Sequence, residues 1–179
     1  IPYTIIGGIR FYERKEIKDI FAFLRLIANP HDRVSLLRVL NVPARGLGEK
    51  IENLLLEEWD KNPELPFTAL IKQLLTNKQT YSLSKGHERG LLEFMEVFEA
   101  ITPQTNICKL YEVIIERIDY LSYLAAEYER EEYRTKSENL RELYHSMAFF
   151  EKKYADQGSM AQETQLQSFL AEVALLQEK

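Results

Sequence analysis

Residues 40–59 contain the feature that most restricts how this chain can fold. In this stretch an apolar-periodic segment runs into the sequence V-P-A-R-G-L-G at residues 42–48 and then directly into a second apolar-periodic segment. Two glycines one residue apart between such segments predict two helices joined by a tight turn. The first N–H groups of the second helix have no partners inside that helix, and the positive end of its dipole lies behind them. This helix start suits a phosphate group, and the guanidinium of the adjacent Arg45 could clamp the same phosphate.

The turn has two interpretations that its residues alone leave open. It is either an ordinary helix–helix connection with a glycine C-cap, or a helix–hairpin–helix element that holds a nucleic-acid backbone without reading bases. The charge distribution favours the second interpretation. Residues 1–50 hold nine Lys or Arg against five acids, whereas the remainder holds 14 against 23, for a net charge of −5. A DNA-binding face is therefore expected in the first third of the chain.

Helical periodicity extends over almost the whole chain. Only residues 3–6 and 9–12 are typical of strands. Helices are predicted over residues 14–28, 34–40, 51–61, 66–75, 84–101, 106–118, 119–132, 137–154 and 164–177. Asp32 is expected to cap the second of these helices, and the pattern Thr164-x-x-Gln167 is typical of a capping box. The predicted fold is mainly α, an irregular helical bundle with a short N-terminal β segment and a helix–hairpin–helix-like turn.

Cysteine and histidine usage restricts the chemistry and the compartment. The single cysteine, Cys108, excludes an internal disulfide framework and a thiolate metal cluster, which indicates a reducing compartment. The three histidines are far apart, and none has a carboxylate or thiol at metal-ligand spacing. The sequence shows no apolar run of membrane-spanning length and no signal peptide, so a cytoplasmic location without membrane contact is expected.

The residues around the turn form a longer pattern. Residues 7–30 read GGIRFYERKEIKDIFAFLRLIANP, and residues 36–48 read LLRVLNVPARGLG. Both stretches closely resemble the UvrD/PcrA/Rep group of superfamily 1 DNA helicases. The family motif Gly-Gly-x-x-Phe-aromatic-x-Arg-x-Glu-Ile-Lys-Asp is matched by Gly7, Gly8, Phe11, Tyr12, Arg14, Glu16, Ile17, Lys18 and Asp19. The family segment Thr/Val-Pro-x-Arg-Gly-Ile-Gly is matched with Leu47 in place of isoleucine, a change that preserves an apolar plug.

The resemblance implies a division of the chain and a set of DNA contacts. Residues 1–28 would be the edge of the second RecA-like domain, 2A, and residues 29–179 the all-helical 2B insertion, which in the family contacts the duplex ahead of the fork. Expected contacts to the duplex backbone come from Arg38, Arg45, Gly46, Leu47, Gly48 and Lys50. Expected contacts to the single strand come from Phe11, Arg14 and Lys18. Arg14 also has a local interpretation, as a residue at a helix start that pairs with Glu16 or Asp19.

The implied function is an accessory DNA-binding and regulatory subdomain of an ATP-dependent DNA helicase with roles in DNA repair. Its partners would be DNA, contacted independently of sequence, and the remainder of the helicase chain. ATP and Mg²⁺ would bind elsewhere in the parent enzyme, because this sequence has neither a P-loop nor the acidic pair that holds Mg²⁺. The chain by itself is therefore expected to need no cofactor and to hydrolyse no ATP.

A different class of function stays open on the sequence alone. In this alternative the acidic residues after position 50 bind a protein partner or a second helicase copy, and the glycine turn is only structural.

Overall fold

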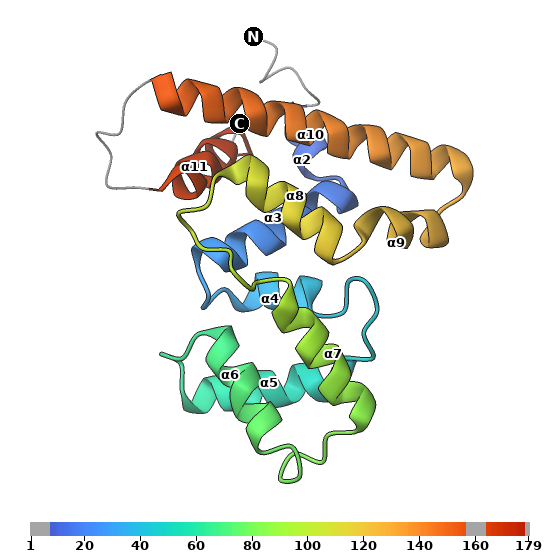
Figure 1. Ribbon diagram of the computed structural model, residues 1–179, viewed down its shortest axis with the longest axis vertical. Helices are drawn as coiled ribbons and strands as arrows, with labels where there is room; N and C mark the ends of the chain where they lie inside the picture. Colours follow the sequence, from blue (N-terminus) through green and yellow to red (C-terminus); the bar gives the residue numbers. More distant parts are fainter. Residues whose placement is uncertain (1–7, 157–163, 178–179) are drawn as a thin grey trace.

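The computed structural model describes residues 8–156 and 164–177, and within them every regular element is a helix (Figure 1). The helices are α2 (Gly8–Tyr12), α3 (Lys15–Ala28), α4 (Arg33–Val39), α5 (Glu49–Lys61), α6 (Phe67–Thr76), α7 (Lys85–Glu96), α8 (Ile107–Arg117), α9 (Tyr120–Glu127), α10 (Arg130–Asp156) and α11 (Gln165–Gln177). The predicted mainly α class is confirmed. None of these helices is long and apolar enough to cross a membrane.

Helix α3 lies at the centre of the molecule. Lys18 is the one exposed residue of α3, and buried residues, most of them apolar, lie on nearly all sides of the helix. Such a helix must be covered on all sides. Below it in Figure 1 lie α4 to α7, here called the lower group. The upper group consists of α2, α10 and α11, which lie above α3 in this view, together with α8, which crosses it, and α9, which lies to its right.

Two neighbouring phenylalanines of α3 connect it to these two groups. Phe23 packs on Phe94 and Phe98, with ring centroids 6.4 and 6.1 Å away, and thereby joins α3 to the lower group. Phe21 stacks on Phe169 of α11 at 5.8 Å, and Phe169 in turn meets Phe150 of α10 at 5.3 Å. Both groups therefore share one hydrophobic core through α3.

The only tryptophan lies in the lower group. Trp59 of α5 is 1% exposed, and its Nε1–H donates to the carbonyl oxygen of Leu65 at 2.9 Å. The guanidinium of Arg33, in α4, lies 5.2 Å from the indole ring centroid. The indole thus links α5 to α4 and to the loop that precedes α6.

The N-terminal segment is helical where the structure describes it. Residues 9–12, predicted as strand, lie in α2, so that prediction is wrong for them; residues 3–6 lie outside the described residues. The Tyr12 ring meets Phe11 at 5.2 Å and Phe21 at 5.7 Å, and both Phe11 and Tyr12 are buried. Successive side chains of a strand point to opposite faces, whereas a helical turn lets both rings enter the same core.

Two of the predicted helix caps are present in the structure. The Asp32 carboxylate accepts from the N–H of Ser35 at 3.0 Å, which confirms the predicted N-cap of α4. At the start of α11, Thr164 Oγ1 accepts from the N–H of Gln167, and Gln167 Oε1 accepts from the N–H of Thr164. This reciprocal pair confirms the predicted capping box.

Two predicted helices have other bounds in the structure. The helix predicted over residues 119–132 stops at Glu127, and α10 begins at Arg130 rather than at residue 137. The start of α10 is anchored by Lys136, whose ammonium contacts the Glu16 carboxylate at 3.0 Å and lies 4.6 Å from the Tyr128 ring centroid. The charged side chains of residues 127–134, just before Lys136, are exposed.

Helix α7 also differs from its prediction. It ends at Glu96 instead of residue 101, and its Leu92 is 48% exposed. The buried face is formed by Gly90, Leu91 and Phe94.

The aromatic contacts of α11 lead to a test of the shared core. Phe169→Ala removes a ring that packs on both Phe21 and Phe150, so we expect the free energy of unfolding to fall by about 3–5 kcal/mol in urea titrations. Leu175→Ala on the same helix is the matched control, because Leu175 is 62% exposed and its truncation should change stability by less than about 0.5 kcal/mol. Equal losses in the two variants would contradict this account of the core.

Candidate nucleic-acid interface

The segment between α4 and α5 closes through a single asparagine. The Asn41 side-chain oxygen accepts from the backbone N–H of Arg45, and also from that of Leu47 at 3.2 Å. Gly46, between them, has φ +72°, a left-handed conformation that side chains rarely adopt. Gly48 is the N-cap of α5. Residues 45–48, here called the 45–48 turn, are therefore a defined structure that leads directly into a helix.

The turn packs against α7, and the two helices that it joins, α4 and α5, pack chiefly on other helices and not on each other. Helix α4 packs chiefly on α3, and α5 packs on α6. A Cβ added at Gly90 of α7 would lie 2.2 Å from the Arg45 carbonyl oxygen and 3.0 Å from two carbons of Leu47. Leu47 itself is fully buried, as expected of an apolar plug. The absence of a side chain at position 90 is thus what lets the turn approach the helix.

The turn presents unsatisfied backbone donors to solvent. Gly46 and Gly48 are exposed. Within residues 8–156 and 164–177, the backbone N–H groups of Gly46, Gly48, Glu49 and Lys50 have no hydrogen-bond acceptor. They lie at the positive end of the α5 dipole, where an anion is stabilised. The local geometry expected of a phosphate-binding helix start is therefore present.

The side chain of Arg45 is turned inward. Its Nη1 donates to the carbonyl oxygens of Val39 and Leu40, at 3.1 and 3.0 Å, at the end of α4. The guanidinium also lies 5.4 Å from the ring centroid of Phe94. Burial lowers the pKa of this guanidinium to about 10, and the nearby carboxylate of Glu93 acts in the opposite direction. In this structure Arg45 caps α4, whereas the sequence had suggested a phosphate clamp.

The other two cations expected near the duplex differ in their availability. Lys50 is exposed. Its ammonium donates to the carbonyl oxygen of Ser82, in the loop before α7, at 2.7 Å. Arg38 is already hydrogen-bonded within the protein. Its Nε donates to the Asp19 carboxylate at 3.0 Å, and its Nη2 donates to the carbonyl oxygen of Lys15 at 3.3 Å.

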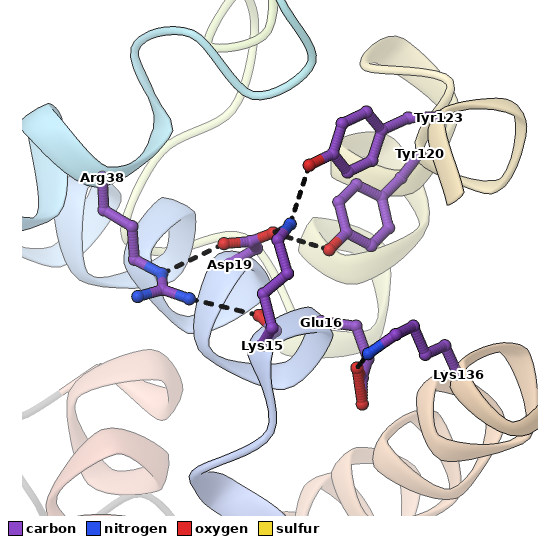
Figure 2. A network of polar contacts seen from close by, with 7 residues as sticks. All are labelled: Lys15, Glu16, Asp19, Arg38, Tyr120, Tyr123 and Lys136. Carbon is purple, nitrogen blue, oxygen red and sulfur yellow. Dashed lines mark hydrogen bonds and ion pairs between the residues drawn. The ribbon is translucent and has the colours of Figure 1, made fainter. Parts of the chain in front are cut away.

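Asp19 is the centre of a buried polar network (Figure 2). Its carboxylate, 2% exposed, accepts from Lys15 Nζ at 2.7 Å, Arg38 Nε at 3.0 Å and the Tyr120 hydroxyl at 2.7 Å. Burial and the Asp19 charge raise the pKa of Tyr120, so its hydroxyl stays a donor. Burial alone would lower the pKa of Lys15, but hydrogen bonds to Asp19 and Tyr123 raise it overall.

A second buried carboxylate joins the N-terminal motif to α10. Glu16, 1% exposed, accepts from Lys136 Nζ at 3.0 Å and from Asn139 Nδ2 at 3.1 Å. Arg14 Nη1 donates to the same Asn139 side chain at 2.6 Å, and its guanidinium lies 5.5 Å from the Phe11 ring centroid. Neither local pairing expected for Arg14, with Glu16 or with Asp19, is formed.

The residues expected to contact single-stranded DNA do not share one environment. Phe11 is fully buried, whereas Arg14 and Lys18 are exposed, and Arg14 is held by its hydrogen bond to Asn139 of α10. Lys18 lines a small cavity together with Arg25 and Arg38. Burial lowers the pKa of Arg25, as does the positive charge of Arg38, while Asp32 raises it. Arg25 had no part in the sequence-based site; its position seven residues, or about two helical turns, after Lys18 on the same side of the helix was the available signal.

Asn41 and Gly90 were also missed. An asparagine directly after a helix end is a common turn residue, which is a weak signal. Gly90 lies far along the chain inside a helical pattern, where an isolated glycine often has a packing reason.

The described residues thus form an all-helical domain with a glycine turn at the start of α5. The sequence profile of the UvrD-like helicase C-terminal domain matches residues 1–179, and the chain belongs to this family.

Individual relatives agree with this assignment. The chain is 36% identical to the ATP-dependent DNA helicase UvrD1 of Mycobacterium tuberculosis over 80% of its length. It is 34% identical to DNA helicase II of Escherichia coli and 32% identical to the ATP-dependent DNA helicase PcrA of Staphylococcus aureus, in each case over 98% of its length. It spans only 18%, 24% and 23% of these three relatives, respectively.

The close approach at Gly90 leads to a stability test. We expect Gly90→Ala to lower the free energy of unfolding by about 1–3 kcal/mol, because the new methyl group meets backbone that cannot move away freely. Gly86→Ala is the matched control on the same helix. Its Cβ would have ordinary contact with Ser84 Oγ at 3.6 Å, and the substitution should be neutral or stabilising. Urea unfolding of both variants measures the difference, and a neutral Gly90→Ala would contradict the packing described.

The Asp19 network leads to a second test. Tyr120→Phe removes one of three donors to a buried carboxylate, and we expect a loss of about 1.5–3 kcal/mol in the free energy of unfolding. Tyr144→Phe removes an exposed hydroxyl that donates to Glu112, and it should leave stability nearly unchanged. Thermal and urea unfolding of the two variants provide the comparison. Similar stabilities would show that the Tyr120 hydroxyl contributes nothing to the core.

Proposed function

We propose that this chain is the accessory DNA-binding and regulatory part of an ATP-dependent, UvrD-like DNA helicase. In this proposal residues 1–28 belong to the edge of domain 2A and residues 29–179 form the 2B subdomain. Family membership and the relatives named above support the parent assignment. ATP and Mg²⁺ would act in other parts of the parent, and DNA and the remainder of the helicase chain would be the partners.

The observation that carries the proposal is the set of free N–H groups at the head of α5. Backbone amides bind a phosphate oxygen without regard to the base attached to it, so the contact would be independent of sequence. Lys50, in the first turn of α5, would add a positive charge beside the same phosphate. Release of counterions from the DNA would make binding weaken steeply as salt rises.

A second basic surface lies on the N-terminal side of the turn. Lys18, Arg25 and Arg38 meet at one cavity, and Lys18 is exposed. We propose that this group supplements the 45–48 turn by attracting the backbone of the single strand or of the adjoining duplex. The proposed contact by Phe11 would require its ring to leave the core, so the exposed cations are the stronger candidates.

The packing of α3 limits how such a subdomain would move. A rotation of 2B against 2A would need a hinge at the proposed boundary between residues 28 and 29. Because α3 shares its core with both groups of helices, a rotation at residue 28 would have to break the contacts of Asp19 and Glu16 with residues later in the chain. We therefore propose that α3, although assigned to 2A by its sequence motif, moves together with residues 29–156 and 164–177.

The decisive experiment removes one amide and changes no charge. We expect Gly48→Pro, which lacks the N–H, to bind a fluorescent forked duplex about tenfold more weakly by anisotropy at low salt. Gly48→Ala keeps the N–H, and its Cβ would have no heavy atom within 4 Å, so it should bind like the wild type. Circular dichroism verifies that both variants are folded. Equal binding by the two variants would exclude the turn from the DNA contact and favour a protein-interaction module.

A further inference from the structure

The backbone N–H groups of the 45–48 turn alternate between two roles. The N–H groups of Arg45 and Leu47 are both held by the side-chain oxygen of Asn41. They alternate along the chain with the N–H groups of Gly46 and Gly48, which have no acceptor within the described residues. One side chain thus fixes every second amide of the turn and leaves the others free for a ligand.

The Arg45 guanidinium supports the same arrangement from the other side. It ties the turn to the carbonyl oxygens of Val39 and Leu40, and it lies against the Phe94 ring. Turning this guanidinium outward to a phosphate would break both hydrogen bonds and remove the cation from the aromatic face. The carbonyl oxygen of Arg45 meanwhile rests against Gly90 of α7. The backbone around residue 45 is therefore fixed by three independent contacts.

We propose that Asn41 and Arg45 are positioning residues that preorganise the free amides of Gly46 and Gly48, and that the Arg45 guanidinium does not itself contact the bound phosphate. This inference rests on the proposed function, since it concerns how the same turn holds DNA. Preorganised donors bind more tightly because the ligand does not have to order them.

The salt dependence of binding separates a positioning residue from a phosphate ligand. Removing a cation that contacts phosphate lowers the slope of log affinity against log salt by about one. Removing a residue that only shapes the turn lowers affinity by the same factor at every salt concentration. Lys50→Ala provides the reference for a cation placed at the phosphate.

The experiment measures anisotropy of a labelled duplex with the full 179-residue chain over a series of salt concentrations. We expect Asn41→Ala, Arg45→Ala and Arg45→Lys each to weaken binding about tenfold with an unchanged salt slope. Arg45→Lys keeps the positive charge but loses the planar guanidinium that reaches two carbonyls and an aromatic face. Tyr111→Phe, which loses a hydrogen bond to the carbonyl oxygen of Leu140 far from the turn, is the control for a general loss of stability.

A spectroscopic measurement on the free chain excludes a merely structural explanation. In ¹H–¹⁵N spectra, Asn41→Ala should shift the amide signals of Gly46 and Gly48, whereas Tyr111→Phe should leave them in place. Asn41→Asp retains an oxygen acceptor and should restore the wild-type positions of both signals.

The possible failures of this inference and of the proposed function are distinct. A wild-type chain that does not bind duplex would overturn the proposed function and this inference with it. If the wild type binds, a salt slope reduced by Arg45→Ala but kept by Arg45→Lys would identify Arg45 as a phosphate ligand and overturn this inference alone. Unshifted glycine amides in Asn41→Ala would remove Asn41 from the positioning role.

Discussion

The buried carboxylate of Asp19 is the contact on which the arrangement of helices depends. A carboxylate inside a protein is destabilising unless donors surround it, and Asp19 receives them from α3, α4 and α9. Because α4 belongs to the lower group and α9 to the upper group, the two groups are held in one orientation about α3. Helix α4 leads directly into the 45–48 turn, so the place of the turn is fixed by the same contact.

The parts of the fold that could be predicted from the sequence are those decided by near neighbours. Asp32 and the Thr164–Gln167 pair cap their helices through residues three positions away, and the sequence shows both partners. The conformation of residues 9–12 and the start of α10 depend instead on packing against Phe21 and on the pairing of Glu16 with Lys136. Those partners are distant in the chain, and no local pattern indicates them.

In the candidate site, too, the features set by neighbouring residues could be predicted, and those set by distant contacts could not. The spacing of Gly46 and Gly48 was enough to predict a helix start with free amides, because this property belongs to the backbone of a few consecutive residues. The direction of the Arg45 side chain was not predictable, since it is decided by Phe94 and by carbonyls at the end of α4. A charged residue beside a glycine turn can serve the ligand or the turn, and only its tertiary contacts distinguish the two.

The position of Trp59 gives the molecule an optical probe of one half of its core. Its indole is enclosed by α5, Leu65 and Arg33, all in or beside the lower group, and the sequence has no other tryptophan. Intrinsic fluorescence therefore follows that half, whereas far-ultraviolet circular dichroism averages over every helix. If Asp19 makes one cooperative unit of both groups, the two signals share a single denaturation midpoint; a half that melted alone would separate them.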